Sequence, residues 1–224
     1  GGERPKLLGD RFNGSGFLMK FSPPPLSPQG ARWADLLHLE ALCARTLNAV
    51  GVRAVHATAG QTSGRTTLVV DRFDRLARRG RRGAATLYWL AMERWGDVSL
   101  SAPEVTRRLA LEGLLDPQSA ATCARVHAFS AAIGNDDAHL GNYGLLFDDE
   151  GRASLSPLYD VLPMRFAPRN DELPDEFIAP RALEEDGDVS AWVDVLARSV
   201  AACDDVSLEF RRRWLRWVSR PLLG

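Results

Sequence analysis

Three oxygen-bearing side chains in the second half of the chain have the types and spacing that phosphoryl transfer requires. Asp137 lies in the segment Ile133–Tyr143, Asn142 follows it in the same segment, and Asp160 ends the short segment Pro157–Asp160. Asp137 can accept or orient the proton of an attacking hydroxyl group. The amide oxygen of Asn142 and the carboxylate of Asp160 are ligands that Mg²⁺ accepts. Together they predict a site that holds magnesium and a phosphate donor beside an acceptor hydroxyl.

The chain between Asn142 and Asp160 is predicted to form a β-hairpin. Gly144–Phe147 and Ala153–Leu155 have the composition of short strands, and the acidic segment Asp148–Gly151 is typical of a turn between them. Because a hairpin brings its ends together, we expect two distant sequence signals to meet at one point. The plainer alternative is that the Asn and Asp residues of the first segment only cap a helix or line a solvated turn.

Further charged residues in the first quarter of the chain suit a phosphate donor. The opening segment Gly1–Lys6 combines a glycine turn with basic residues, which suits a phosphate group. Lys20 lies in the predicted strand Phe17–Phe21, and Glu40 lies in a predicted helix, Trp33–Val50, whose apolar residues follow a helical period. A strand lysine and a helix glutamate pair in this way where donor phosphates are held. The alternatives are an edge-strand lysine and a solvated helix glutamate.

The segment Asp71–Arg75 is predicted to be a hinge between two lobes. It follows the predicted strands Val52–Thr58 and Thr66–Val70, and polarity returns abruptly at its first residue. Backbone groups at Asp71 and Phe73 would then contact the edge of an adenine ring. The alternative is a strand end with exposed ion pairs.

The remainder of the chain is predicted to be mainly helical. The expected helices are Thr86–Trp95, Ala102–Leu115, Pro117–Ala132, Asp188–Ala202 and Val206–Val218. Trp89 and Trp95 are expected to pack in the core or between lobes. The proline-rich stretch 161–180 is expected to be irregular, with Arg165 and Arg169 near the site.

The composition excludes several classes of protein. With 224 residues, 45% hydrophobic and 25% charged, the chain is typical of a globular protein with a full core. A net charge of -1 provides no global field for nucleic acid or anionic lipid. Cys43, Cys123 and Cys203 are isolated in apolar contexts, so we expect buried thiols in a reducing compartment. No apolar run reaches membrane-spanning length, and a cytoplasmic enzyme without a membrane partner is expected.

These segments together resemble the HipA family of serine/threonine-protein kinases, the toxins of bacterial toxin–antitoxin pairs. The resemblance spans most of the chain, and its matching segments are Gly2–Lys6, Leu18–Lys20, the helix around Glu40, Val70–Arg75, Gly134–Asn142 and Pro157–Asp160. The last three segments are the specific ones. Because the chain opens abruptly in Gly1–Lys6, an upstream portion is also expected.

The resemblance implies an α+β fold with two lobes, distantly related to eukaryotic protein kinases, and it implies ATP and Mg²⁺ as cofactors. Residues 1–75 would form a small β-rich N-lobe with the phosphate loop, strand lysine and hinge. Residues 76–224 would form a mainly helical C-lobe with the catalytic loop and the metal-binding aspartate. Asp137 would be the catalytic aspartate, and Asn142 and Asp160 the magnesium ligands. The nucleotide-binding residues would be Lys20, Gly2, Lys6, Asp71, Phe73, Asp74 and His139.

The resemblance also implies partners. Characterised members of the family phosphorylate an aminoacyl-tRNA synthetase, glutamyl-tRNA synthetase, and bind a helix-turn-helix antitoxin. Two other functions fit the same residues. One is a small-molecule phosphotransferase of the aminoglycoside type, which uses a similar Asp, Asn and Asp set. The other is a non-catalytic, nucleotide-binding regulator that docks a DNA-binding antitoxin. No direct contact with nucleic acid is expected.

Overall fold

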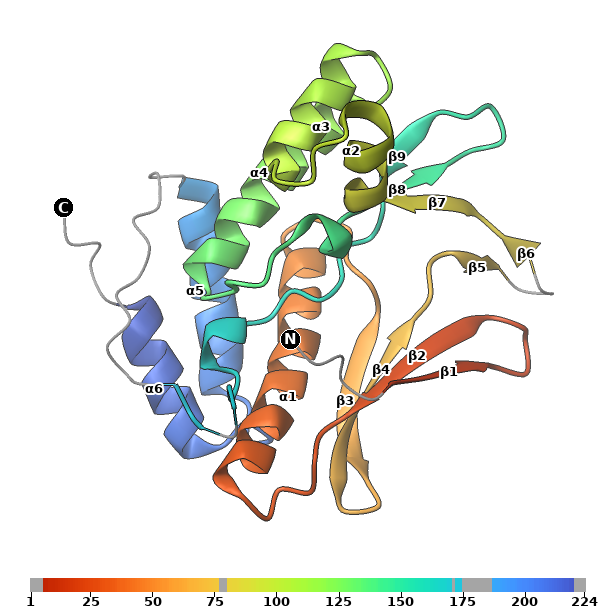
Figure 1. The fold of residues 1–224 in the computed structure, drawn as a ribbon. Helices are drawn as coiled ribbons and strands as arrows, with labels where there is room; N and C mark the ends of the chain where they lie inside the picture. The colour runs from red at the N-terminus through yellow and green to blue at the C-terminus, as the bar shows by residue number, and fades with distance from the viewer. Residues whose placement is uncertain (1–5, 77–79, 171, 175–186, 220–224) are drawn as a thin grey trace.

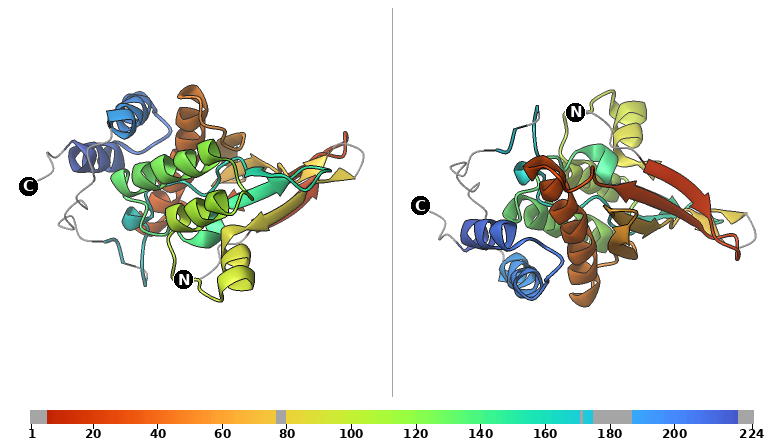
Figure 2. Two further views of the ribbon diagram at one scale, coloured as in Figure 1. Left: turned by 90° about the horizontal axis from the view of Figure 1, so that it is seen from above. Right: turned by 90° about the horizontal axis from the view of Figure 1, so that it is seen from below.

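A long helix stands between a group of strands and the C-terminal helices. The computed structural model describes residues 6–76, 80–170, 172–174 and 187–219. Helix α1 (Pro28–Ala49) has the strands on one side and α5 (Gly187–Ala201) and α6 (Leu208–Val218) on the other (Figure 1). The views from above and below show the same separation of strands from the last helices (Figure 2). The mixture of sheet and helix agrees with the predicted α+β class.

The first sheet is antiparallel, with four strands in the order β1-β2-β4-β3. Its strands are β1 (Lys6–Asp10), β2 (Gly16–Phe21), β3 (Ala57–Thr62) and β4 (Arg65–Asp71). Lys20 lies in β2 opposite Leu68 of β4, which is fully buried. Because successive strand residues point to opposite faces, Lys20 and Met19 face different sides of the sheet.

Capping residues in the sequence mark both ends of helix α1. The hydroxyl of Ser27 accepts a hydrogen bond from the amide of Gly30 at 3.1 Å, and Pro28 occupies the first helical position. Gly51, with φ of 84°, follows the last turn in the left-handed conformation that favours glycine. The helix is buried on most sides because it packs on β3, β4 and α5. It therefore gives a rigid base to the groups it carries.

The remaining strands form two small sheets. Most of the remaining helices lie around the second sheet, while the last short helix packs through Phe166 on α6. The strands are β5 (Arg75–Leu76), β6 (Gly80–Arg81), β7 (Gly83–Thr86), β8 (Gly144–Phe147) and β9 (Ala153–Leu155), and β8 lies between β7 and β9. The helices are α2 (Leu87–Trp95), α3 (Ala102–Leu111), α4 (Pro117–Ala132), η2 (Leu140–Asn142) and η3 (Met164–Phe166). The predicted hairpin after Asn142 is confirmed by the pairing of β8 with β9.

One cluster of buried apolar side chains joins these parts. It includes Leu68 of β4, Leu39 of α1, Phe129 of α4 and Trp214 of α6, all with no exposed surface. This continuous core fixes α1 relative to the chain segments that follow the hairpin. Within the described residues, no helix combines the length and apolar character needed to span a bilayer.

Several local predictions were wrong. The predicted strand Val52–Thr58 begins only at Ala57, because the residues before it bond to the segment that follows β9. The predicted helix from Thr86 begins at Leu87, since β7 pairs with β8 up to Thr86. Trp89 is 57% exposed rather than packed in the core. Cys203 is only partly buried, whereas Cys43 and Cys123 are buried as expected.

Candidate active site

Three charged side chains from distant parts of the chain meet beside α1. The Nζ atom of Lys20 donates to both carboxylate oxygens of Glu40, at 2.7 and 2.9 Å. It also donates to the Oδ1 atom of Asp160. The pairing of Lys20 with Glu40 that the sequence suggested is confirmed. This triad ties β2, α1 and the segment after β9 together.

The burial of the triad makes its charges depend on each other. Glu40 is 4% exposed, and burial raises its pKa to about 7, with Asp160 adding to the rise and Lys20 opposing it. For Lys20, burial disfavours the charged form, but Glu40 and Asp160 outweigh it and raise the pKa. For Asp160, burial favours the neutral form, but Lys20 outweighs it and lowers the pKa. The lysine is therefore held as a cation at the point where all three meet.

The backbone around Asp160 is fixed from both sides. The amide of Leu158 donates to the carbonyl of Arg53 at 3.0 Å, and the carbonyl of Leu158 accepts from Val55 at 2.9 Å. Asp160 has φ of 55°, a left-handed conformation that aspartate tolerates better than most residues. Its carbonyl accepts a hydrogen bond from the side chain of Asn135 at 3.5 Å. These bonds aim the carboxylate of Asp160 at Lys20.

The loop that carries Asp137 is held by its own hydrogen bonds. The buried side chain of Asn135 accepts from the amide of Asp137 at 3.3 Å. The amide nitrogen of the Asn142 side chain donates to the carbonyl of Asp137 at 2.8 Å, which leaves the side-chain oxygen of Asn142 for another partner. His139 caps η2, because its Nδ1 atom accepts from the amide of Gly141 at 3.0 Å. The carboxylate of Asp137 is exposed.

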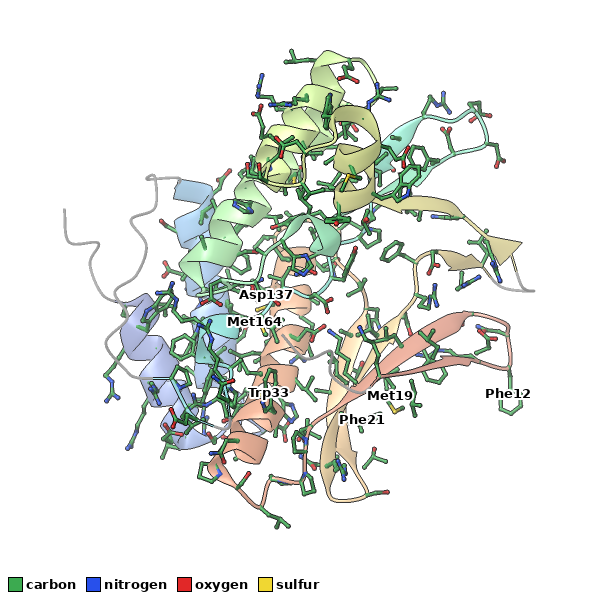
Figure 3. The ribbon with its side chains drawn as sticks, viewed as in Figure 1. Phe12, Met19, Phe21, Trp33, Asp137 and Met164 are labelled. Carbon is green, nitrogen blue, oxygen red and sulfur yellow. The ribbon has the colours of Figure 1, made fainter. Side chains whose placement is uncertain are left out.

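A cleft of about 1180 Å³ brings the predicted residues together. Asp137, Asn142 and Asp160 all line it, although the hairpin separates the last two in sequence. The other described charged or polar residues that line it are Lys6, Lys20, Ser22, Gln29, Glu40, Asp136, His139, Arg169 and Asn170. Figure 3 shows Asp137 and Met164, another lining residue, beside α1. The predicted convergence of the three oxygen-bearing residues on one space is therefore observed.

The donor set in this cleft fits magnesium and a nucleotide phosphate. The described residues contain no group of three or more His, Cys, Asp or Glu that could enclose a metal ion. Mg²⁺ does not require one, because it is commonly held by one or two protein oxygens together with water and substrate phosphates. Asn142 and Asp160 offer such oxygens, and Lys20 and Lys6 offer positive charge in the same cleft.

Other predicted nucleotide-binding residues lie outside this cleft. Asp71 forms an ion pair with Arg11, and the Nδ1 atom of His56 lies 3.4 Å from its other carboxylate oxygen. The carboxylate of Asp74 is bonded by Arg72, which lowers its pKa. Their proposed contacts with adenine and ribose remain predictions. Gly2 lies outside the described residues.

Phe73, the other predicted hinge residue, is connected to the site through Tyr159. The rings of Phe73 and Tyr159 lie 5.7 Å apart, and the hydroxyl of Tyr159 donates to the carbonyl of Gly141 at 2.9 Å. Sequence reasoning missed this role of Tyr159. Its position directly before Asp160 marked it as a neighbour of the site, but no local signal identified Gly141 as its partner.

Sequence reasoning also missed the ion pair that joins the catalytic loop to the segment after Asp160. Arg169 donates to the carboxylate of Asp136 at 2.8 Å, and Arg165 lies 3.9 Å from the same oxygen. Both arginines were expected near the site, but no sequence spacing identifies Asp136 as their partner. The pair fixes one wall of the cleft.

Comparison with known proteins identifies the family and the fold. The model of the HipA-like C-terminal domain matches residues 1–214. The chain belongs to this family. Among solved structures, this HipA-like chain resembles HipA of Shewanella oneidensis MR-1, which was solved in complex with HipB and operator DNA. The TM-score is 0.64 and the identity 17%, and the match covers 98% of this chain and 64% of that one. It also resembles the Helicobacter pylori proinflammatory kinase CtkA, with a TM-score of 0.62 and 11% identity over 97% and 87% of the two chains. The predicted α+β, kinase-like fold is confirmed.

Two curated relatives are much longer than this HipA-like chain. Toxin YjjJ of Escherichia coli strain K12 is 34% identical over 174 residues, which are 76% of this chain and 39% of that protein. The putative kinase Y4mE of Sinorhizobium fredii is 28% identical over 151 residues, which are 61% and 34% of the two chains. The chain thus spans little more than a third of the length of these relatives.

Proposed function

We propose that this HipA-like chain is an ATP- and Mg²⁺-dependent protein kinase that transfers the γ-phosphoryl group to a serine or threonine hydroxyl. One observation carries the proposal. A single cleft is lined by the triad of Lys20, Glu40 and Asp160 and by the loop residues Asp137 and Asn142. Phosphoryl transfer depends mainly on positioning and charge neutralisation, and these residues supply both.

Each residue has a distinct task in this proposal. Lys20, held by Glu40, binds the donor phosphates, while Asn142 and Asp160 hold the metal ion. Bound MgATP supplies the phosphoryl group and charge neutralisation at the leaving oxygen. A carboxylate oxygen of Asp137 accepts the proton of the acceptor hydroxyl. The oxygen of that hydroxyl forms the new bond to phosphorus, and the bond to the β-phosphate oxygen breaks with its electron pair leaving on ADP.

We further propose that the chain is part of a toxin that a partner protein restrains. The 34% identity to a protein named toxin YjjJ supports this, as does the likeness to HipA in a complex with HipB and operator DNA. A helix-turn-helix antitoxin is the proposed partner. The cytoplasm, where the free thiols of Cys43, Cys123 and Cys203 stay reduced, is the proposed location.

Label transfer from [γ-³²P]ATP tests the enzymatic proposal. Purified protein and a bacterial lysate are incubated with magnesium, and protein is separated from metabolites by acid precipitation. We expect label on serine or threonine of a protein. Asp137→Asn should lower its rate at least about 100-fold, with an unchanged melting temperature because Asp137 is exposed. Label in metabolites would instead identify a small-molecule phosphotransferase, and nucleotide binding without transfer would identify a regulator.

A further inference from the structure

Part of the lining of the cleft that holds the charged triad is apolar, and we call this part the chamber. Its walls are formed by Pro23, Trp33, Leu37, Leu162, Met164 and Ala167. Pro23 precedes α1, Trp33 and Leu37 lie on α1, and the other three belong to the segment around η3. Figure 3 shows Trp33 and Met164 on these two elements. The chamber and the catalytic groups therefore share one continuous space.

The periodicity of α1 sets the distance between the chamber and the triad. Trp33, Leu37 and Glu40 are spaced by four and three residues, so they lie along one face of the helix. At 1.5 Å per residue, Trp33 lies roughly 10 Å along the axis from Glu40. An extended peptide covers about 3.3 Å per residue. The chamber is thus roughly three peptide residues away from the triad.

The backbone on the η3 side of the chamber offers a purine base few hydrogen bonds. A purine is recognised by hydrogen bonds from backbone groups at its edge, and the η3 segment has few to offer. The amides of Met164, Phe166 and Ala167 already donate to carbonyls of the same segment, at 2.8, 3.1 and 3.0 Å. Pro163 and Pro168 have no amide hydrogen. An apolar side chain, which needs no such bonds, fits these walls better.

The charged groups of the cleft, rather than the chamber, suit a phosphate group. Lys20 is bound to Glu40 and Asp160, and Arg169 is bound to Asp136 at 2.8 Å. The six chamber residues carry no charge, so a phosphate group gains nothing there. An acceptor hydroxyl must approach Asp137, which lines the same cleft.

We propose that the chamber binds a bulky apolar side chain of the acceptor protein, two to three residues from the phosphorylated serine or threonine. This inference rests on the proposed kinase function and specifies its substrate class. Burying a leucine side chain there should raise kcat/KM about tenfold over glycine at the same position.

Paired synthetic peptides test the inference. Each peptide contains one serine, with leucine or glycine at a single position within three residues on either side. Met164→Ala removes part of the chamber wall. Met19→Ala is the matched control, because Met19 is also partly buried but does not line the cleft. We expect the wild type and Met19→Ala to prefer one leucine peptide about tenfold. Met164→Ala should reduce that preference to about threefold or less.

Three results would overturn the inference. In the first, the wild type phosphorylates all peptides equally. In the second, Met164→Ala retains the full preference for the leucine peptide. In the third, Met164→Ala raises KM for ATP and leaves the peptide preference unchanged, which would make the chamber a nucleotide pocket. If no transfer occurs to any protein or peptide, the proposed kinase function fails separately. Calorimetric binding of the same leucine and glycine peptides then decides the question, because equal affinities would remove the chamber's role.

Discussion

Replacing Lys20 by methionine should damage both stability and activity, and a second substitution should repair only the stability. In Lys20→Met, the buried Glu40 loses its cation, so it must either stay charged without a partner or take up a proton, which its raised pKa favours. Breaking a buried ion pair in this way costs about 3–5 kcal/mol. The lower end, about 3 kcal/mol, applies here because the side chains of Lys20 and Asp160 are 19% and 38% exposed, so water relieves part of the cost.

The double variant Lys20→Met/Glu40→Met removes the stranded charge. An apolar pair of similar size is often as stable as the ion pair that it replaces, so we expect most of the loss to be restored; Asp160 also loses its cation, but its side chain is 38% exposed and water can solvate it. Phosphoryl transfer should stay far below the wild-type rate in both variants, because neither has the Lys20 cation that we propose binds the donor phosphates. The single substitution should lower Tm by roughly 6–12 °C, and the double substitution should restore most of that loss.

Urea denaturation followed by tryptophan fluorescence measures the stability, and label transfer from ATP measures the activity. Equal stability losses in the single and double variants would refute the assignment of Glu40 as the stranded charge. Transfer at the wild-type rate by either variant would refute the role of Lys20.

Three further substitutions test other parts of the site and core. Tyr159→Phe removes the hydroxyl that donates to the carbonyl of Gly141 at 2.9 Å, so the free energy of unfolding should fall by about 1 kcal/mol. Its kcat should fall more than its KM changes, and an unchanged kcat would exclude a positioning role. Asp160→Asn keeps a residue that tolerates φ of 55° but removes the charge, so calorimetry should find ATP affinity that no longer rises with magnesium; a retained magnesium effect would contradict the metal role. His38 is buried, and burial lowers its pKa below 6.5. The unfolded chain therefore binds the extra proton, and the free energy of unfolding should fall as pH drops below about 6.5. In thermal melts His38→Leu should weaken this pH dependence, and an identical slope would contradict the assignment.

The parts of the site that could be predicted from sequence were those with local signals. The turn between β8 and β9 is marked by an acidic, glycine-containing segment, so the return of the chain from Asn142 to Asp160 followed from short-range rules. The pairing of Lys20 with Glu40 was also accessible, because an isolated lysine in an apolar strand and a glutamate among apolar helix residues both need partners.

Contacts set by tertiary packing could not be predicted. The residues Val52–His56 have strand composition, but the backbone groups of Arg53 and Val55 bond to Leu158, and nothing local indicates that partner. The bond from Tyr159 to Gly141 and the pair of Asp136 with Arg169 also join segments whose distance depends on the whole fold. Trp89 illustrates the opposite error, since an aromatic residue on a predicted helix was expected inside and lies exposed.

A crystal structure with a non-hydrolysable ATP analogue and Mg²⁺ tests the central claim most directly. We expect the metal ion bound to the side-chain oxygens of Asn142 and Asp160, the phosphates beside Lys20, and the terminal phosphate facing Asp137. A nucleotide whose phosphates lie away from Lys20, or a metal ion that contacts neither Asn142 nor Asp160, would contradict the proposed phosphoryl transfer.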